Sequence, residues 1–428
     1  MPWPFTIGGS ILALLALWFW ARAVRLRRLI QDLPTSKTKG VFIGLVELKG
    51  TAEIEEPLTS YLAEISCVQF GWSVSEEWRR IVTYTVTDKD GNTRTETRVE
   101  SGWTTVASGG DSSLFYLVDD TGSILVRPAG ASIEGRSVFS QTVTPFSDLY
   151  YGKGPPGGIP DTTGRRMFSE SAVPLHAPVF VVGKARQRED VVAAEIAKDP
   201  DAPLFLISTR SEEQVAGGHG WMIWFTGILV MALPAGGWAI DRNQMGPAEV
   251  PDYLPAGWFA LASFGILMLA WLWQVFNSMT DLRNRVRQAA SLVDIQLKRR
   301  NDLIPELVKV VGAARAHEAG VQQSLAKLRA KMAAAHLTGL SAGIMGMAEA
   351  YPELRANENF LKLQKELADT EQRIAMARDY LNDAITNANT RAERFPEGWV
   401  ASLAGVRRQP LLVTDGIERQ PVKLNLAP

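Results

Sequence analysis

Length and charge exclude several classes of protein. The chain has 428 residues with 45 basic and 46 acidic side chains, which are interspersed along it. This length allows two or three domains, and the charge balance disfavours nucleic acid as a partner. Cys67 is the only cysteine, so a disulfide within the chain and a cysteine-rich zinc site are excluded. The four histidines show no ligand spacing, and we therefore expect neither a metal nor another cofactor.

The chain begins with an apolar run, Ile7–Ala23, close to the ~20 residues that a helix needs to cross a bilayer. It predicts a transmembrane helix at 5–24. A cleaved signal peptide is the alternative, since Ala21-Arg22-Ala23 loosely resembles a cleavage site. The basic residues follow the run instead of preceding it, which is the reverse of a secretory signal.

Four arginines close this first run: Arg22, Arg25, Arg27 and Arg28. The positive-inside rule then places the N-terminus outside and the following residues in the cytoplasm. The same arginines are candidate contacts for anionic lipid, because each basic side chain near the surface contributes on the order of 1 kcal/mol. The alternative is that they only orient the helix.

A β-rich domain is predicted at 29–215, where short strand patterns alternate with Gly, Pro, Asp and Thr. Two hairpins are clearest, turning at Asp88–Asn92 and at Asp119–Gly122. The segment Gly152–Thr163 predicts a surface loop and Glu189–Ala197 a short helix. Cys67 has strand-like neighbours and no nearby histidine, which favours a buried, inert thiol. Strands are predicted at Gly40–Lys49, Ile81–Thr87, Arg94–Glu100 and Val179–Lys184.

Three short strings resemble catalytic or binding motifs, and each has a better structural explanation. In the Gly-x-Gly-x-x-Gly string at Gly152–Gly157, two prolines occupy the place where a phosphate-binding helix would begin. Asp120-Thr121-Gly122 matches a motif of aspartic proteases but lies where a hairpin must turn. His317-Glu318 lacks the second histidine of a metalloprotease motif.

Two further apolar runs predict transmembrane helices at 220–240 and 256–278. Arg283, Arg285 and Arg287 follow the last of them, so the C-terminal region is also expected in the cytoplasm. The sequence thus predicts a multi-pass α+β membrane protein with three transmembrane helices. Nine of the thirteen tryptophans lie in or beside the runs, as is typical of the headgroup boundary: Trp3, Trp18, Trp20, Trp221, Trp224, Trp238, Trp258, Trp271 and Trp273.

After the last apolar run the hydrophobic period becomes 3.5 residues, which is typical of coiled-coil packing. We expect an antiparallel α-helical bundle at 279–400 and a C-terminal tail at 401–428. Three helical runs show this period. The seam positions of the first are Met279, Leu282, Val286, Ala289 and Val293, and the same phase continues through Gln296 and Arg300 to Leu303, Leu307 and Val310. Those of the second are Val321, Leu325, Leu328, Met332 and Ala335, and those of the third are Phe360, Leu363, Leu367, Thr370, Ile374, Ala377, Leu381, Ile385 and Ala388.

The first run contains Pro305, and its phase passes through this proline with Arg300 in the seam. One continuous, kinked helix therefore fits better than two helices, although a fresh start capped by Asp302 is the alternative. A buried arginine needs a carboxylate within reach, and Glu371 is the predicted partner of Arg300. The candidate polar lock of the bundle comprises Arg299, Arg300, Asp302, Glu371 and Arg378.

The stretches QLKRRNDLIPELV at Gln296–Val308, YPELRANENFLKLQKELADTEQRIAMARDYLN at Tyr351–Asn382 and RFPEGWVA at Arg394–Ala401 resemble the LemA family. The resemblance implies a membrane-tethered antiparallel bundle of poorly defined activity. Where that family often has tyrosine before the matching Asn382, this chain has Leu381. The matching positions are Arg299, Arg300, Asp302, Leu303, Ile304, Pro305, Asn357, Phe360, Leu363, Gln364, Glu371, Arg378, Asn382, Phe395 and Pro396.

Residues Leu29–Lys184 resemble, more weakly, the GIDE-type domain of membrane-bound E3 ubiquitin ligases. The resemblance rests on IQDLPTSKTKGVFIGLVELKGTAE, PLTSYLAEISCVQF and FYLVDDTGSILVRPAGASIE. Those ligases end in a cysteine-rich RING, which a chain with one cysteine cannot build, so ubiquitin transfer is not implied. The combination of the two resemblances suggests a bacterial inner-membrane protein.

The sequence favours a non-enzymatic membrane scaffold that recruits a protein partner or forms a homo-oligomer. One alternative is an adaptor for a membrane protease or an envelope-stress system. Another is a membrane-associated hydrolase, for which Asp120 is the candidate residue. The sequence names neither the partner, the oligomer number nor the physiological process.

Overall fold

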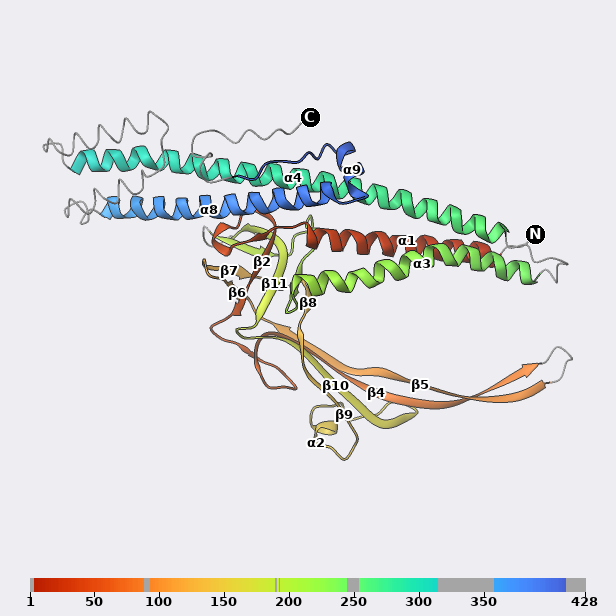
Figure 1. Ribbon diagram of the computed structural model, residues 1–428. Coiled ribbons are helices and arrows are strands. Elements are labelled where there is room, and N and C mark those ends of the chain that lie inside the picture. Colours follow the sequence, from red (N-terminus) through yellow and green to blue (C-terminus); the bar gives the residue numbers. More distant parts are fainter. Residues whose placement is uncertain are drawn as a thin grey trace. The chain divides into compact units, whose positions relative to one another are not determined.

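A computed structural model describes residues 4–87, 93–188, 191, 193–244, 254–314 and 358–412 (Figure 1). The chain divides into two compact units. The first comprises residues 1–36 and 213–428 and is helical, and the second comprises residues 37–212 and is mostly β-sheet. The fold is therefore α+β.

The helical unit contains three helices that are long and apolar enough to cross a membrane. They are α1 (Pro4–Gln31), α3 (Glu212–Gln244) and the first part of α4 (Leu254–Ala314). α1 and α3 approach each other closely at Gly9, where an added Cβ would collide with the backbone of Leu233. Small residues permit such close helix packing. The Asp241 carboxylate of α3 accepts hydrogen bonds from the backbone N–H and the hydroxyl of Thr6, at 2.8 and 2.7 Å, and thereby caps the start of α1.

The second half of α4 packs along α8 (Glu358–Glu393). The two helices run in opposite directions, because Arg300 of α4 contacts Glu371 of α8 while Ser278 contacts Arg391. Most of the predicted seam is buried: Met279, Leu282, Val286, Ala289 and Val293 on α4, and Leu367, Thr370, Ile374, Leu381, Ile385 and Ala388 on α8. Gln296, Leu363 and Ala377 of the seam are half-buried. The predicted run at 321–335 lies outside the described residues.

α4 is one helix of 61 residues that contains Pro305. The prediction of a continuous helix is therefore confirmed, and no new helix begins at Asp302. Leu303 and Ile304, directly before the proline, are both buried. Their packing helps to offset the lost backbone hydrogen bond. After α8 come the short helix α9 (Glu397–Leu403) and an irregular segment at 404–412.

The β-rich unit contains a closed ring of strands. β2 pairs with both β6 and β11, and the pairings β6–β7, β7–β12 and β12–β11 complete the ring. β13 extends the sheet from β11 and pairs in parallel with β8. The bounds are β2 (Gly44–Glu53), β6 (Phe115–Val118), β7 (Ser123–Val126), β8 (Ser132–Glu134), β11 (Pro178–Gln187), β12 (Ala194–Ala197) and β13 (Leu206–Ser208), with the 3-10 helix η1 (Thr38–Gly40) before them. The short strand β1 (Thr35–Ser36) belongs by its residues to the first unit.

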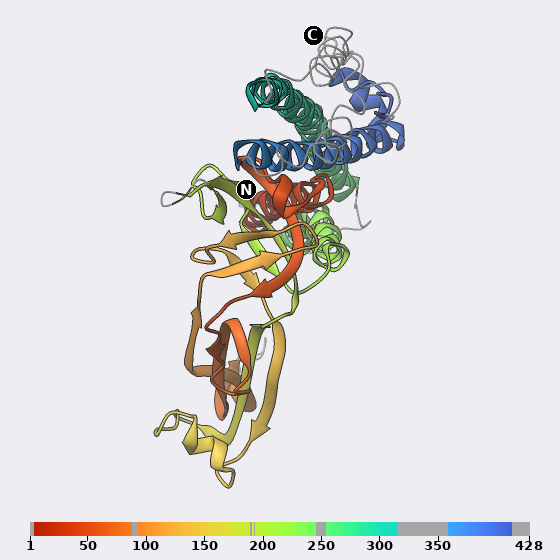
Figure 2. The ribbon, with the colours of Figure 1, turned by 90° about the vertical axis from the view of Figure 1, so that its left-hand side faces the viewer.

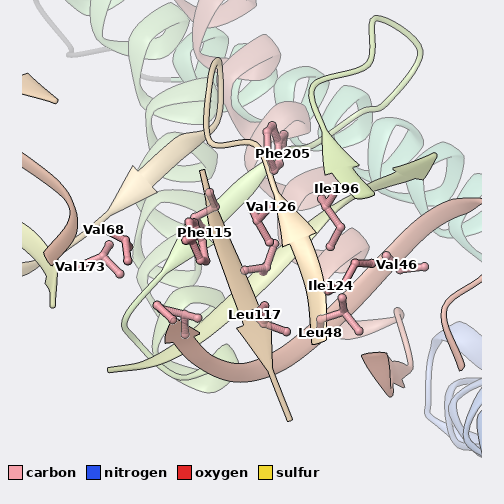
Figure 3. Packing of buried hydrophobic residues seen from close by; sticks show 14 of the residues in the cluster. Val46, Leu48, Val68, Phe115, Leu117, Ile124, Val126, Val173, Ile196 and Phe205 are labelled. Carbon is pink, nitrogen blue, oxygen red and sulfur yellow. The ribbon is translucent and has the colours of Figure 1, made fainter. Parts of the chain in front are cut away.

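The core of this unit lies inside the ring (Figure 3). Inward-facing side chains alternate along the strands, as Val46 and Leu48 do on β2 and Phe115 and Leu117 on β6, and all four are essentially inaccessible to solvent. Burial of such side chains contributes roughly 1.5–3 kcal/mol each. This alternation is the pattern that the sequence shows.

A second sheet forms the other part of the β-rich unit (Figure 2). Its longest strands, β4 and β5, pair antiparallel over nearly their whole length. β10 pairs with β4 only as far as Trp78, so the end of the β4–β5 hairpin is a two-stranded ribbon. The bounds are β3 (Leu58–Thr59), β4 (Ser66–Thr87), β5 (Thr93–Ser112), β9 (Arg136–Val143) and β10 (Thr162–Pro174), with the short helix α2 (Asp148–Gly152) between β9 and β10.

Three of the predicted strands lie within β4, β5 and β11, and the one predicted at Gly40–Lys49 overlaps β2, which begins at Gly44. The hairpin turning at Asp119–Gly122 joins β6 to β7. The turn predicted at Asp88–Asn92 lies outside the described residues. The helix predicted at Glu189–Ala197 is wrong, because Ala194–Ala197 is strand β12. This segment pairs antiparallel with β11 on one edge and parallel with β7 on the other, and the ladders of the ring outweigh its weak helical preference.

Candidate functional site

Side chains from three distant segments meet at Asp32, directly after the end of α1. The Asp32 carboxylate Oδ2 accepts a hydrogen bond from Nη1 of Arg391 at 2.5 Å and from the hydroxyl of Ser278 at 2.8 Å. Arg391 Nη1 also lies 2.8 Å from the Ser278 oxygen. Asp32, Ser278 and Arg391 are all buried. One carboxylate thus links the end of α1 to α4 and α8.

A second carboxylate continues the network. Glu397, in the first turn of α9, accepts hydrogen bonds from Nε of Arg391 at 2.8 Å and from Nη2 of Arg28 at 3.3 Å. We call these five residues, Asp32, Ser278, Arg391, Glu397 and Arg28, the Asp32 cluster. Two guanidinium groups alternate in it with two carboxylates, so each buried charge has an opposite neighbour.

The cluster keeps Arg391 charged. Burial by itself lowers the pKa of Arg391, but the charge of Asp32 and the hydrogen bond with Glu397 outweigh it and raise the pKa above its usual value. A permanently charged, hydrogen-bonded arginine is a fixed structural link and a poor proton donor. The role that this arrangement supports is therefore structural: its ion pairs join the helices.

A polar cavity of about 350 Å³ adjoins the cluster. Its lining includes three arginines that follow apolar segments, Arg25, Arg28 and Arg285, and two acidic residues, Asp32 and Asp281. Trp273, the last tryptophan of the apolar part of α4, lies at the same cavity. Of the predicted lipid contacts, Arg25 and Arg28 thus face this cavity, Arg22 is exposed and Arg27 is half-buried.

The predicted polar lock is brought together in part. Arg300 is buried, and its Nη1 lies 3.5 Å from Oε1 of Glu371 across the α4–α8 seam. Arg378 is half-buried on α8, and its Nε and Nη2 have no hydrogen-bond partner within the described residues. Arg299 and Asp302 are exposed on α4 and lie on its solvent side. That this group locks the bundle stays a prediction.

The segment after α9 returns along α8. Asn389 donates to the carbonyl of Gln409 at 2.8 Å and accepts from its N–H at 3.0 Å. Asn382 makes the same two bonds with Leu412, at 3.2 and 2.8 Å. Asn382 thus has polar partners in this chain although Leu381 precedes it.

In the β-rich unit, the strings that resemble motifs have structural roles. Asp120 lies in the turn between β6 and β7 and forms an exposed ion pair with Lys37, 2.5 Å apart. The neighbouring Asp119 accepts hydrogen bonds from the backbone of Thr121 and Gly122, as in an ordinary turn. Burial raises the pKa of Asp119, but hydrogen bonds from Thr38 and Thr121 outweigh this and lower it to about 2.

The glycine-rich segment predicted as a loop at 152–163 is a loop at 153–161, between α2 and β10, and a buried arginine holds it. Arg166 of β10 donates to the backbone carbonyls of Tyr150, Pro155 and Gly157 and to the carboxylate of Glu76, at 2.6 to 3.1 Å. The loop thus surrounds a guanidinium group in place of a phosphate. Cys67 is fully buried, and burial raises the pKa of its thiol to about 11, so the thiol stays protonated.

Sequence reasoning missed Asp32, Ser278, Arg391 and Glu397. Asp32 lies 246 positions from Ser278 and 359 positions from Arg391, so no local spacing connects them. The available signal was the stretch RFPEGWVA, which carries the LemA resemblance and contains Glu397. The charged side chain of Glu397 in that stretch could have been predicted to have a buried partner of opposite charge.

Comparison with known families matches two parts of the chain. A LemA family model matches residues 289–426, and a model described as E3 Ubiquitin ligase, with the short name GIDE, matches residues 83–236. The predicted fusion of these two domains is confirmed. The LemA match covers α8, α9 and the two tail residues, Gln409 and Leu412, that are bonded by Asn389 and Asn382. No curated protein matches the chain.

Proposed function

We propose that this chain is a non-enzymatic scaffold of the bacterial inner membrane, which recruits a protein partner or assembles with itself. The observation that carries the proposal is the continuity of α4. A single helix leads from an apolar segment of membrane-spanning length into the α4–α8 pair, and the Asp32 cluster ties the end of α1 to the same pair. Such an anchor holds a soluble surface at a fixed place beside the bilayer.

In this proposal the three apolar helices span the membrane at 5–24, 220–240 and 256–278, with the N-terminus outside. The β-rich domain at 29–215, the bundle at 279–400 and the tail at 401–428 are cytoplasmic. α4 and α8 are two members of an antiparallel, coiled-coil-like bundle. The arginines at the ends of the apolar runs support this orientation.

Cysteine labelling of intact cells tests the orientation. In a Cys67→Ser background, a cysteine introduced as Ser402→Cys is exposed on α9 and should resist an impermeant thiol reagent. Asn243→Cys, exposed at the other end of α3, is the matched control and should react. Strong labelling at 402 with weak labelling at 243 would invert the model of the membrane topology.

The mass of the extracted protein tests the scaffold. We expect full-length protein in a mild, uncharged detergent to be larger than a monomer, or to copurify with a second protein from native membranes. Light scattering over a concentration series and mass spectrometry of the copurified material measure the two possibilities. A monomeric mass with no copurified protein would contradict the proposal.

An adaptor for a membrane protease or an envelope-stress system is the second candidate. The observation that favours it is the tail held by Asn382 and Asn389, because asparagine amides that bind backbone atoms suit the capture of an extended peptide. Crosslinking in native membranes should then recover a protease or one of its substrates. Recovery of this chain alone supports the scaffold instead.

A further inference from the structure

The tail covers a groove between α4 and α8. Arg283 and Val286 of α4, and Ile385 and Asn389 of α8, line a small cavity there together with residues of the tail, Gly405, Val406, Arg407 and Gln409. Arg283 donates to the carbonyl of Ala404 at 3.0 Å, at the entrance of the groove. The groove is therefore made by both helices of the seam.

The spacing of the hydrogen bonds shows that the tail is extended. Asn382 and Asn389 are seven residues apart on α8, which is about 10.5 Å along a helix. Their partners, Leu412 and Gln409, are three residues apart. The tail therefore advances about 3.5 Å per residue and runs opposite to α8, with the rise of a β-strand.

The asparagines recognise the backbone of the tail. Each amide gives one hydrogen bond to a carbonyl and takes one from the N–H of the same residue. This is the pair of bonds that a neighbouring strand makes in a sheet. Pro410, between the two bonded residues, needs no donor partner of its own. Any extended segment that offers two free backbone positions three residues apart satisfies the same amides.

The tail is held lightly along its length. Val406 is buried, but Leu411 is about half exposed, and the ion pair of Arg408 with Glu393 is exposed on both sides. Gly405 joins the tail to α9 with a φ of +70°, a conformation that glycine adopts at no steric cost. A segment with a glycine joint and few buried side chains is released at small cost.

We propose that the groove binds the C-terminal segment of a second copy of this chain, so that two copies exchange their tails. The second copy is the favoured occupant because its tail carries the residues already seated in the groove, and exchange of an identical element costs little. The proposal rests on the self-assembly put forward above and names its contact. The ligand class is an extended peptide read through its backbone.

Co-capture of two tagged full-length chains tests the exchange. Chains that carry different tags are mixed in an uncharged detergent, one tag is captured and the other is quantified. The wild type and Asn387→Ala, a matched substitution on the same helix that removes no hydrogen bond to the described part of the tail, should co-capture equally. Combining Asn382→Ala with Asn389→Ala should lower co-capture about tenfold or more, because two pairs of hydrogen bonds are lost.

A peptide separates the groove from the assembly. A fluorescent peptide of residues 405–412 should bind the wild-type chain and compete with co-capture. The same peptide, N-methylated at the positions of Gln409 and Leu412, should do neither, because it keeps its side chains and loses the two N–H donors. Equal binding of the methylated peptide would overturn backbone recognition.

The remaining outcomes distinguish the two proposals. Undiminished co-capture by the double variant would overturn tail exchange and leave self-assembly through another surface. Absence of wild-type co-capture, with the plain peptide still bound, would overturn the second copy as occupant together with self-assembly. The groove would then hold a segment of a different protein.

Discussion

Replacing Arg391 with methionine should strongly destabilise the helical unit. The change removes a cation that bonds two carboxylates at 2.5 and 2.8 Å, and the side chains of Arg391 and Asp32 are only 10% and 9% exposed. Breaking a buried pair by removing one partner costs about 3–5 kcal/mol, because the remaining charge is left uncompensated. For a unit of this size, that corresponds to a fall in melting temperature of roughly 6 to 20 °C.

A second arginine on the same helix supplies the control. Arg373 forms an i,i+4 ion pair with Asp369 at 2.8 Å, and both side chains are about one third exposed. Arg373→Met should cost only about 0.3–0.5 kcal/mol, since exposed pairs of this kind contribute little. Loss of α-helical circular dichroism on heating, in full-length protein in a mild detergent, measures both variants.

The melting temperatures of the two variants decide whether the Asp32 cluster stabilises the helical unit. If Arg391→Met melts within a degree or two of Arg373→Met, the Asp32 cluster does not hold the segments together. A double variant sharpens the test: Asp32→Asn should destabilise the wild type substantially and the Arg391→Met protein much less, because the two residues act as one unit. Additive effects would show that their partners lie elsewhere.

Four further expectations follow from other parts of the structure. Glu371→Gln should lower the free energy of unfolding of the helical unit by about 1–3 kcal/mol, and its melting temperature with it, since Arg300 loses the carboxylate 3.5 Å away; an unchanged melting temperature would mean that Arg300 is otherwise satisfied. Arg166→Met should destabilise the β-rich unit by about 3–5 kcal/mol, as limited proteolysis within the glycine-rich loop would reveal. Cys67 should resist maleimide at pH 8 in the folded protein and react fully after denaturation, because its pKa is about 11 and the thiol is buried. Asp119 has a folded pKa of about 2 against an ordinary 3.8, so its stabilising contribution is present above about pH 4 and is lost as the pH falls towards 2; Asp119→Asn should flatten an acid titration of thermal stability in that window.

Patterns within one element were predictable from the sequence. The heptad phase identified the buried face of α4 before Pro305 and that of α8, and the helix itself continues through Pro305 as predicted. It also led from Arg300 to Glu371, because two seams that pack together must bring their polar members to the same level. The Asp-Thr-Gly turn was predictable for the same reason: turn chemistry acts over four residues.

The failures came where distant segments decide the structure. Ala194–Ala197 has a helix-forming composition but became a strand, because β11 and β7 offer it two ladders in a closed ring. Arg378 was placed in the polar lock, yet its Nε and Nη2 find no partner within the described residues. Arg391, further along the same helix, carries the cluster instead. Periodicity indicates which face of a helix is buried, but not which residue of another helix lies opposite.

By itself, the sequence determined the local and periodic features: three apolar helices, a β-rich segment, a helical seam and the two family resemblances. These depend on the chemistry of residues a few positions apart, so a single chain displays them. Only the tertiary structure decided that Asp32, Ser278, Arg391 and Glu397 form one buried network, and that Asn382 and Asn389 hold the tail. Buried charges and amides must find partners, but the partner is set by which backbones pack together, and that depends on the whole chain.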